Sequence, residues 1–205
     1  PDPAKERRWL VATALAAGIG VAGHAAAFAN PAAATFAFAS VAPDLSRLLA
    51  GVGVGLAATV PLALALLWLT RTRQPNVAAF REAQLNFFES TGFAFSWPLI
   101  VAIALTAGVW EEWIFRGVLQ GALDRYAPLW LAVLAANVLF GLLHWQSAGY
   151  AVIAGLVGVY LSAVYLATGD LTAAIVTHAA YDVVTLVQIR RALAARRASS
   201  PVARG

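Results

Sequence analysis

The stretch WEEWIFRG, residues 110–117, lies inside an otherwise apolar run at about residues 97–123. A charged side chain at the centre of a membrane helix costs about 2.5–3.5 kcal/mol, so the charges in this stretch require internal partners. On a helix, Glu112 and Arg116 are four residues apart and share one face, in the favourable order for an ion pair. Glu111 is turned about 100° from Glu112 and has no local partner. We therefore predict that Arg116 pairs with Glu112, whereas Glu111 faces another part of the bundle.

Composition places the chain among integral membrane proteins. Of its 205 residues, 61% are hydrophobic and 12% are charged, whereas soluble domains are about half apolar and a quarter charged. The chain has no cysteine, which excludes disulfides, a thiol nucleophile and cysteine-ligated metal. We interpret the net charge of +4 as basic loops that set membrane topology. The expected partner is therefore the lipid bilayer and not nucleic acid.

Hydrophobic segments predict an all-α fold, a polytopic transmembrane helical bundle of about six spans plus one interfacial amphipathic helix. We expect the amphipathic helix within residues 71–96 and the spans at about residues 9–29, 47–70, 97–125, 128–145, 150–168 and 171–189. The first span has an alternative as a signal peptide, because Ala-Phe-Ala at 27–29 resembles a cleavage site, but its length favours a retained helix. Residues 31–46 read as a loop.

The chain divides into three parts by composition. Residues 1–96 hold the N-terminal membrane helices and the interfacial segment, residues 97–190 form the helical core with the acidic motif, and residues 191–205 are a basic tail. Within the first part, Gly51 and Gly55 are either a small-xxx-small pair for close helix packing or merely loose glycine content.

The distribution of basic residues predicts that both termini are cytoplasmic. Six spans place the termini on one side of the membrane, and the positive-inside rule makes the side with more Lys and Arg the cytoplasm. That side would hold 11 of the 14 basic residues: Lys5, Arg7, Arg8, Arg71, Arg73, Arg81, Arg190, Arg191, Arg196, Arg197 and Arg204.

Further polar residues lie at membrane depth on two later spans. His144 ends the fourth span with Asn137 on roughly the same side, and His178 and Asp182 share one face of the sixth. Intramembrane ionisable residues are functional candidates by default, whereas we interpret His24 in the first span as structural. Helix lengths put Glu111 and His144 near one level. His178 follows a turn by only about seven residues, so it joins them only if that turn lies deep or the helices tilt.

Glutamate with histidine, and no serine or cysteine at a matching site, favours activation of water. The carboxylate takes the proton, an imidazole orients the water or carries a proton, and a second histidine can stabilise the oxyanion. Ser147 and Ser162 lack the sequence context of nucleophiles. The alternative is a zinc set of His144, His178 and Glu111. Zinc sites commonly contain a short-spaced ligand pair, which this chain lacks, so we predict that the site uses neither metal nor cofactor.

Three motifs in chain order resemble the CPBP family, the CAAX-processing and bacteriocin-processing intramembrane glutamic endopeptidases. They are Glu111-Glu112-x-x-x-Arg116, Phe140-x-x-x-His144 and His178-x-x-x-Asp182, and the local pattern Glu-Glu-x-x-Phe-Arg-Gly also fits. The resemblance covers about residues 97–190 and implies a helical bundle with a polar intramembrane cavity.

The resemblance also implies roles for these residues. Glu111 and His144 would activate water, and His178 and Asp182 would line the oxyanion side, with Glu112 and Arg116 as supporting members of the first motif. Asp182 stands where Asn is frequent in the family. An ionised Asp cannot donate a hydrogen bond to an oxyanion, so Asp182 would instead orient His178 or stay protonated in a dry site.

The function predicted from the sequence is a glutamate-type intramembrane endopeptidase acting on a membrane-associated peptide or protein. Its substrate stays open between a prenylated C-terminus, a bacteriocin and a C-terminal sorting anchor. Alanine-rich composition indicates a high-GC bacterium and hence the bacterial cytoplasmic membrane. Two alternatives from other classes are a non-enzymatic immunity or scaffold protein and a proton-relaying transporter, although no inverted repeat supports the latter.

Overall fold

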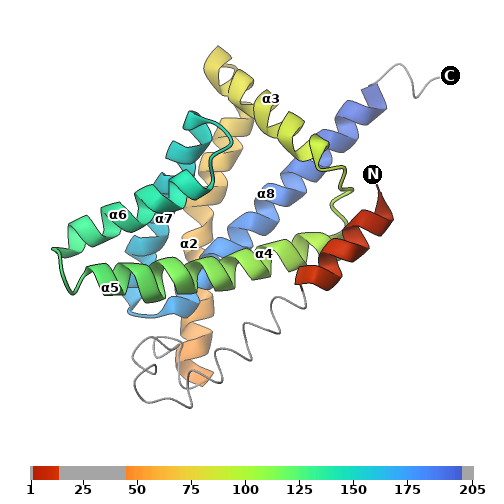
Figure 1. Cartoon of the computed structure of the whole chain (residues 1–205). Coiled ribbons are helices and arrows are strands. Elements are labelled where there is room, and N and C mark those ends of the chain that lie inside the picture. Colours follow the sequence, from red (N-terminus) through yellow and green to blue (C-terminus); the bar gives the residue numbers. More distant parts are fainter. Residues whose placement is uncertain (1, 14–44, 200–205) are drawn as a thin grey trace.

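The structure is a computed structural model that describes residues 2–13 and 45–199. All the regular structure in these ranges is helical (Figure 1), which confirms the predicted all-α class. Residues 3–13 form a helix. The later elements are α2 (Leu45–Arg71), α3 (Pro75–Ser90), α4 (Trp97–Glu112), the π-helix η2 (Trp113–Gln120), α5 (Gly121–Leu123), α6 (Leu129–Leu143), α7 (Ala148–Thr168) and α8 (Leu171–Ser199).

Four described segments are long and apolar enough to cross a membrane, and the protein is an integral membrane protein. These segments are α2, the continuous helix Trp97–Leu123, α7 and α8, in agreement with the spans predicted near 47–70, 97–125, 150–168 and 171–189. Helix α6, predicted as a span over 128–145, has only 15 residues, or about 22 Å. Most of the predicted first span, with its signal-peptide alternative, His24 and nearly all of the 31–46 loop, lies outside the described residues.

Helix α2 packs closely against α8 through glycine. A Cβ atom on Gly51 would lie 3.0 Å from Cβ of Thr172, and one on Gly55 would lie 2.7 Å from the backbone oxygen of Ala173. The carbonyl of Gly55 also accepts a hydrogen bond from Thr177 Oγ1 across the interface. Close backbone approach of this kind is what small residues permit in membrane helices, so the packing interpretation of this glycine pair is confirmed.

Helix α8 extends ten residues beyond the end predicted at residue 189, through Ser199. Leu186, Ile189 and Leu193 are buried in one cluster with Phe95, which precedes α4, and with residues of the first turn of α4. Because their spacing of three and four residues keeps them on one helical face, the apolar stripe of α8 continues past the basic residues at 190–191. Alanine and arginine, which fill much of 190–199, are also good helix formers.

The segment predicted to be interfacial forms the helix α3, none of whose residues is buried. Its Arg81 donates hydrogen bonds from Nη1 to the carbonyls of Leu69, Thr70 and Thr72 at the end of α2. Cationic side chains stabilise helix C-termini in this way. At the other end of α3, Arg196 of α8 forms ion pairs with Glu82 and Glu89.

The N-terminal helix packs on the turn between α3 and α4. Trp9 makes an edge contact with Phe93, and the backbone N–H of Ala94 donates to Oε1 of Glu6. Residues 2–13, α3 and the last turns of α8 therefore gather at one end of the bundle (Figure 1). This arrangement agrees with the predicted grouping of basic residues, whereas their cytoplasmic orientation stays a prediction.

Candidate active site

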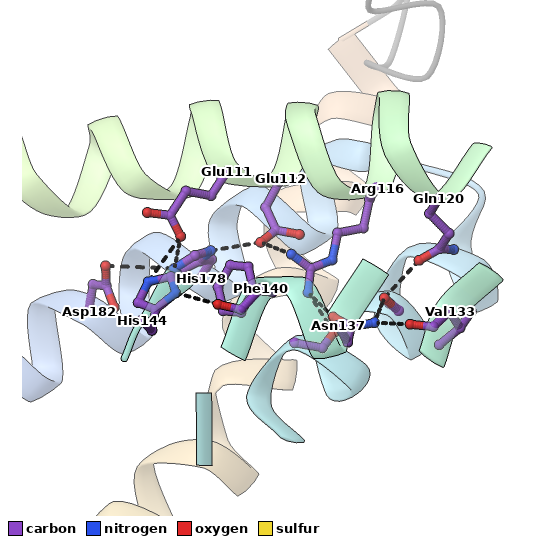
Figure 2. A network of polar contacts seen from close by, with 12 residues as sticks. Glu111, Glu112, Arg116, Gln120, Val133, Asn137, Phe140, His144, His178 and Asp182 are labelled. Carbon is purple, nitrogen blue, oxygen red and sulfur yellow. Dashed lines mark hydrogen bonds and ion pairs between the residues drawn. The ribbon is translucent and has the colours of Figure 1, made fainter. Parts of the chain in front are cut away.

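The acidic motif lies where the helix Trp97–Leu123 changes from α4 to the π-helix η2. A π-helix is wider than an α-helix, is rare, and is frequent at functional sites. Glu112 at the end of α4, and Arg116 and Gln120 within η2, are all buried. Figure 2 shows these side chains projecting with Glu111 from one side of the helix towards α6 and α8. Because the segment is apolar elsewhere, this stripe concentrates its polarity on one face.

Glycine brings α4 and α8 together beside the motif. A Cβ atom on Gly108 would lie 2.9 Å from Cβ of Ala179 and 3.0 Å from the carbonyl oxygen of Ile175. This approach places His178 against the motif, although it follows the α7–α8 turn by few residues. Helix α8 runs obliquely to α4 (Figure 1). The distance of His178 from the α7–α8 turn therefore does not set the depth of this residue. The tilt of α8 explains how His178 reaches the level of the motif.

Glu112 has two cationic or hydrogen-bonding partners and is fully buried. Its Oε1 accepts from Nη1 of Arg116 at 3.0 Å, as the four-residue spacing predicts. The same oxygen lies 2.7 Å from Nδ1 of His178, on another helix. A carboxylate accepts hydrogen bonds, so Nδ1 of His178 is the donor. Glu112 therefore supports two side chains, of which the sequence predicted only Arg116.

Glu111 faces the two histidines. Its Oε2 is 3.6 Å from Nε2 of His144 and 4.0 Å from Nε2 of His178. That oxygen is itself buried and has no hydrogen-bond partner among the described residues. The side chains of Glu111 and His144 are 29% and 30% exposed, compared with 0% for Glu112. The site thus has an open side at Glu111 and a closed side at Glu112.

His144 is held at the end of α6. Helix α6 ends at Leu143, and His144 leaves the helical conformation as its C-cap. Its Nδ1 lies 2.8 Å from the carbonyl oxygen of Phe140, which can only accept a hydrogen bond, so Nδ1 carries the proton. In the neutral ring, Nε2 is then an acceptor that faces Glu111. The ring also lies against that of Phe140, with centroids 4.4 Å apart.

Asp182 completes the group of predicted residues. Its Oδ2 lies 3.7 Å from Nε2 of His178, one turn earlier on α8. This is an ion-pair distance and exceeds a normal hydrogen bond. All six predicted residues, Glu111, Glu112, Arg116, His144, His178 and Asp182, therefore lie in one connected cluster drawn from three membrane helices (Figure 2).

A second buried polar group adjoins the closed side and was not predicted from the sequence. Arg116 Nη2 donates to Oδ1 of Asn137 at 3.0 Å and to the carbonyl of Gly158 at 2.6 Å. Asn137 donates to Ser162, which donates to Gln120. The position of Gln120, four residues after Arg116, was a signal in the sequence that Gln120 lies on the same helical face. No such signal in the sequence pointed to Gly158 and Ser162 of α7. Ser162 is thus a member of a hydrogen-bonded chain, and Ser147 caps α7 by accepting from the N–H of Tyr150.

The described residues of this cluster are not arranged as the ligands of a metal ion. Across residues 2–13 and 45–199, no set of three or more His, Asp or Glu side chains is arranged to hold a metal ion. One ring nitrogen of each histidine is engaged, by Glu112 and by Phe140. Independence from metal itself stays a prediction for experiment.

The fold and the cluster together define an integral membrane protein with an acid–histidine site between its helices. Residues 93–184 match the model of a known family, described as type II CAAX prenyl endopeptidase Rce1-like. The match is to the segment that carries the three motifs, and it confirms their resemblance to the CAAX-processing proteases. At the level of the family, this similarity supports an intramembrane endopeptidase of the CAAX type, a class that acts on membrane-associated proteins. Comparisons with curated proteins and with solved structures gave no match.

Proposed function

We propose that this protein hydrolyses a peptide bond of a membrane-associated substrate with water activated by Glu111 and His144. The observation that carries this proposal is the buried Oε2 of Glu111, which has no hydrogen-bond partner among the described residues and faces Nε2 of His144 at 3.6 Å. Two acceptors at this separation repel each other unless a donor joins them. A water molecule that donates one hydrogen to each would satisfy both atoms.

The reaction follows general base catalysis. The water oxygen attacks the carbonyl carbon of the scissile peptide bond while its proton passes to Glu111. The carbon–nitrogen bond then breaks, and Glu111 returns the proton to the leaving amine. His144 keeps the water oriented through Nε2, since its Nδ1–H is fixed on the carbonyl of Phe140. No metal or cofactor takes part in these steps.

His178 would stabilise the oxyanion. Its Nδ1–H donates to Glu112, and its Nε2 faces the carboxylates of Glu111 and Asp182 at 4.0 and 3.7 Å. Three acidic side chains around one imidazole favour the doubly protonated ring, in which Nε2–H is a donor. Asp182 then acts as an acceptor that helps orient the ring, which is the role left to an ionised aspartate.

The open side of the site supports a membrane-associated peptide segment as the substrate. Glu111, His144 and Asp182 are each about a quarter to a third exposed, whereas Glu112 and Arg116 are fully buried. A peptide segment that reaches this side from the membrane would bring its carbonyl to Glu111. We place the protein in a bacterial cytoplasmic membrane with both termini cytoplasmic, in accordance with its basic residues.

The test is cleavage by the full-length protein in detergent and in liposomes. The probes are a fluorogenic farnesylated CAAX peptide and the same peptide without the prenyl group. Glu111→Gln keeps the shape of the side chain but removes the base, so turnover should disappear while the melting temperature and peptide binding are retained. Normal turnover by this variant would overturn the proposal, as would the failure of the wild-type protein to cleave either probe or a panel of membrane-anchored peptides.

A further inference from the structure

We propose that Asn137 on α6 is a positioning residue for His178, and this inference rests on the proposed function. Asn137 is buried, and its Oδ1 accepts from Nη2 of Arg116 at 3.0 Å. Arg116 donates through Nη1 to Glu112 at 3.0 Å, and the same Glu112 oxygen accepts from Nδ1 of His178 at 2.7 Å. A continuous series of hydrogen bonds therefore leads from Asn137 to the histidine ring (Figure 2).

The amide of Asn137 can adopt only one orientation at this position. Its Nδ2 lies 2.8 Å from the carbonyl oxygen of Val133, which can only accept, whereas Arg116 can only donate. If the amide were flipped, it would set a donor against the guanidinium and an acceptor against the carbonyl. The guanidinium, which only donates, and the carbonyl of Val133, which only accepts, therefore direct Oδ1 towards Arg116. The orientation of the amide on α6 is thus fixed.

Ser162 on α7 strengthens this orientation from the other side. Nδ2 of Asn137 donates to Oγ of Ser162 at 2.9 Å, and that hydroxyl donates to Oε1 of Gln120 at 2.8 Å. Ser162 and Gln120 are both buried, so water does not replace these bonds. The series begins and ends on the α4–η2 helix and passes through α6 and α7, which makes the position of Arg116 depend on all three.

Gly158 leaves the space that the Asn137–Arg116 contact occupies. A Cβ atom at position 158 would lie 2.3 Å from Oδ1 of Asn137 and 3.1 Å from Nη2 of Arg116. The carbonyl of Gly158 also accepts from the same Nη2 at 2.6 Å. The guanidinium is thus held at two points on α6 and α7, and its planar fork presents Nη1 to Glu112 in one direction.

Loss of Asn137 should therefore alter catalysis more than binding. Arg116 would keep Glu112 and Gly158 but would lose the acceptor that fixes the plane of its guanidinium. Glu112 would follow Arg116, and the ring of His178 would no longer be held with Nε2 facing the reacting carbonyl. Misplacement of a reacting group by about 1 Å lowers turnover by about 100-fold.

The test compares Asn137→Leu and Ser162→Ala with the matched control Thr177→Val. Thr177 is a buried hydroxyl residue next to His178, but its Oγ1 bonds to the carbonyls of Gly55 and Ala173, away from the Asn137 series. We expect kcat for the farnesylated peptide to fall about 100-fold in Asn137→Leu and by a smaller factor in Ser162→Ala, with KM unchanged. Thr177→Val should lose stability as Ser162→Ala does and keep wild-type kcat.

Imidazole ¹⁵N NMR supplies a readout that does not depend on turnover. The chain has three histidines, so the spectrum is simple to assign with a His144 variant. In the wild type, Nδ1 of His178 should show a fixed proton shared with Glu112, and this signal should broaden or shift in Asn137→Leu and Ser162→Ala but not in Thr177→Val.

The outcomes separate this inference from the proposed function. If both variants match Thr177→Val in kcat and in the His178 signals, Asn137 is not a positioning residue. If Asn137→Leu does not fold, the milder Ser162→Ala gives the same comparison. If the wild-type protein cleaves no peptide, the proposed function fails, whereas the NMR spectra still decide whether Asn137 orients His178.

Discussion

Replacement of Glu112 by glutamine should lower both the stability of the protein and the turnover of its folded fraction. The side chain is fully buried, and its Oε1 accepts from Arg116 and from His178. Glutamine keeps one acceptor oxygen but leaves the Arg116 charge without a counter-charge. Loss of one partner of a buried ion pair costs about 3–5 kcal/mol. For a chain of this size, about 2–4 °C of melting temperature accompanies each kcal/mol, so the expected decrease is about 6–20 °C.

Turnover should fall beyond the loss of folded protein, because the variant removes the carboxylate that orients His178. The assay is thermal unfolding in detergent, combined with cleavage of the farnesylated peptide well below the melting temperature. Glu111→Gln is the matched control, since Glu111 is partly exposed and its Oε2 has no hydrogen-bond partner among the described residues: this variant should melt like the wild type and be inactive.

Two results would refute this reasoning. A Glu112→Gln protein with wild-type melting temperature and wild-type turnover would show that the Arg116 charge needs no partner. A stable but inactive Glu112→Gln protein, together with a Glu111→Gln protein of near-normal turnover, would show that the roles of the two glutamates are reversed.

Three further predictions concern packing, metal and topology. Gly55→Val should destabilise the protein by about 1–3 kcal/mol through overpacking against α8, whereas Gly53→Ala, with open space around its Cβ, should not lower the melting temperature. Activity should survive EDTA and phenanthroline, and a loss restored by zinc would support the metalloprotease alternative. In this cysteine-free chain, single cysteines introduced at position 40 and in the C-terminal tail should be labelled from opposite sides of the membrane; labelling from the same side would contradict cytoplasmic termini.

Local spacing explains which parts of the site were predictable from the sequence. Glu112 and Arg116 are one helical turn apart, so their pairing follows from helix geometry alone. His144 and Asp182 were identified because ionisable residues are rare at membrane depth. The close packing of Gly55 followed in the same way from the spacing of small residues. The same two glycines were, however, equally compatible with merely loose glycine content in the helix.

The rest depends on how helices cross. The contact between Glu112 and His178 requires the oblique approach of α8 at Gly108, which no spacing within either helix encodes. Gly158 reaches Arg116, and Ser162 reaches Asn137 and Gln120, only because α7 packs against α6 at one rotation. The π-helix η2 likewise has a buried polar face whose hydrogen-bond partners lie on other helices, so spacing within η2 does not reveal them. Helix α8 continues beyond the span predicted to end at residue 189, because Leu193 extends the buried stripe past the basic residues at 190–191.

The shortness of α6 bears on the lipid around the site. Its 15 residues extend over about 22 Å, whereas the hydrocarbon core of a bilayer is about 30 Å thick. Non-helical backbone, such as that at His144, is tolerated at membrane depth only where protein or a water-filled cavity surrounds it. Hydrophobic mismatch of this size is relieved by local thinning of the bilayer. Lipid chain length would therefore act on the protein at α6, because a thicker membrane would oppose this thinning.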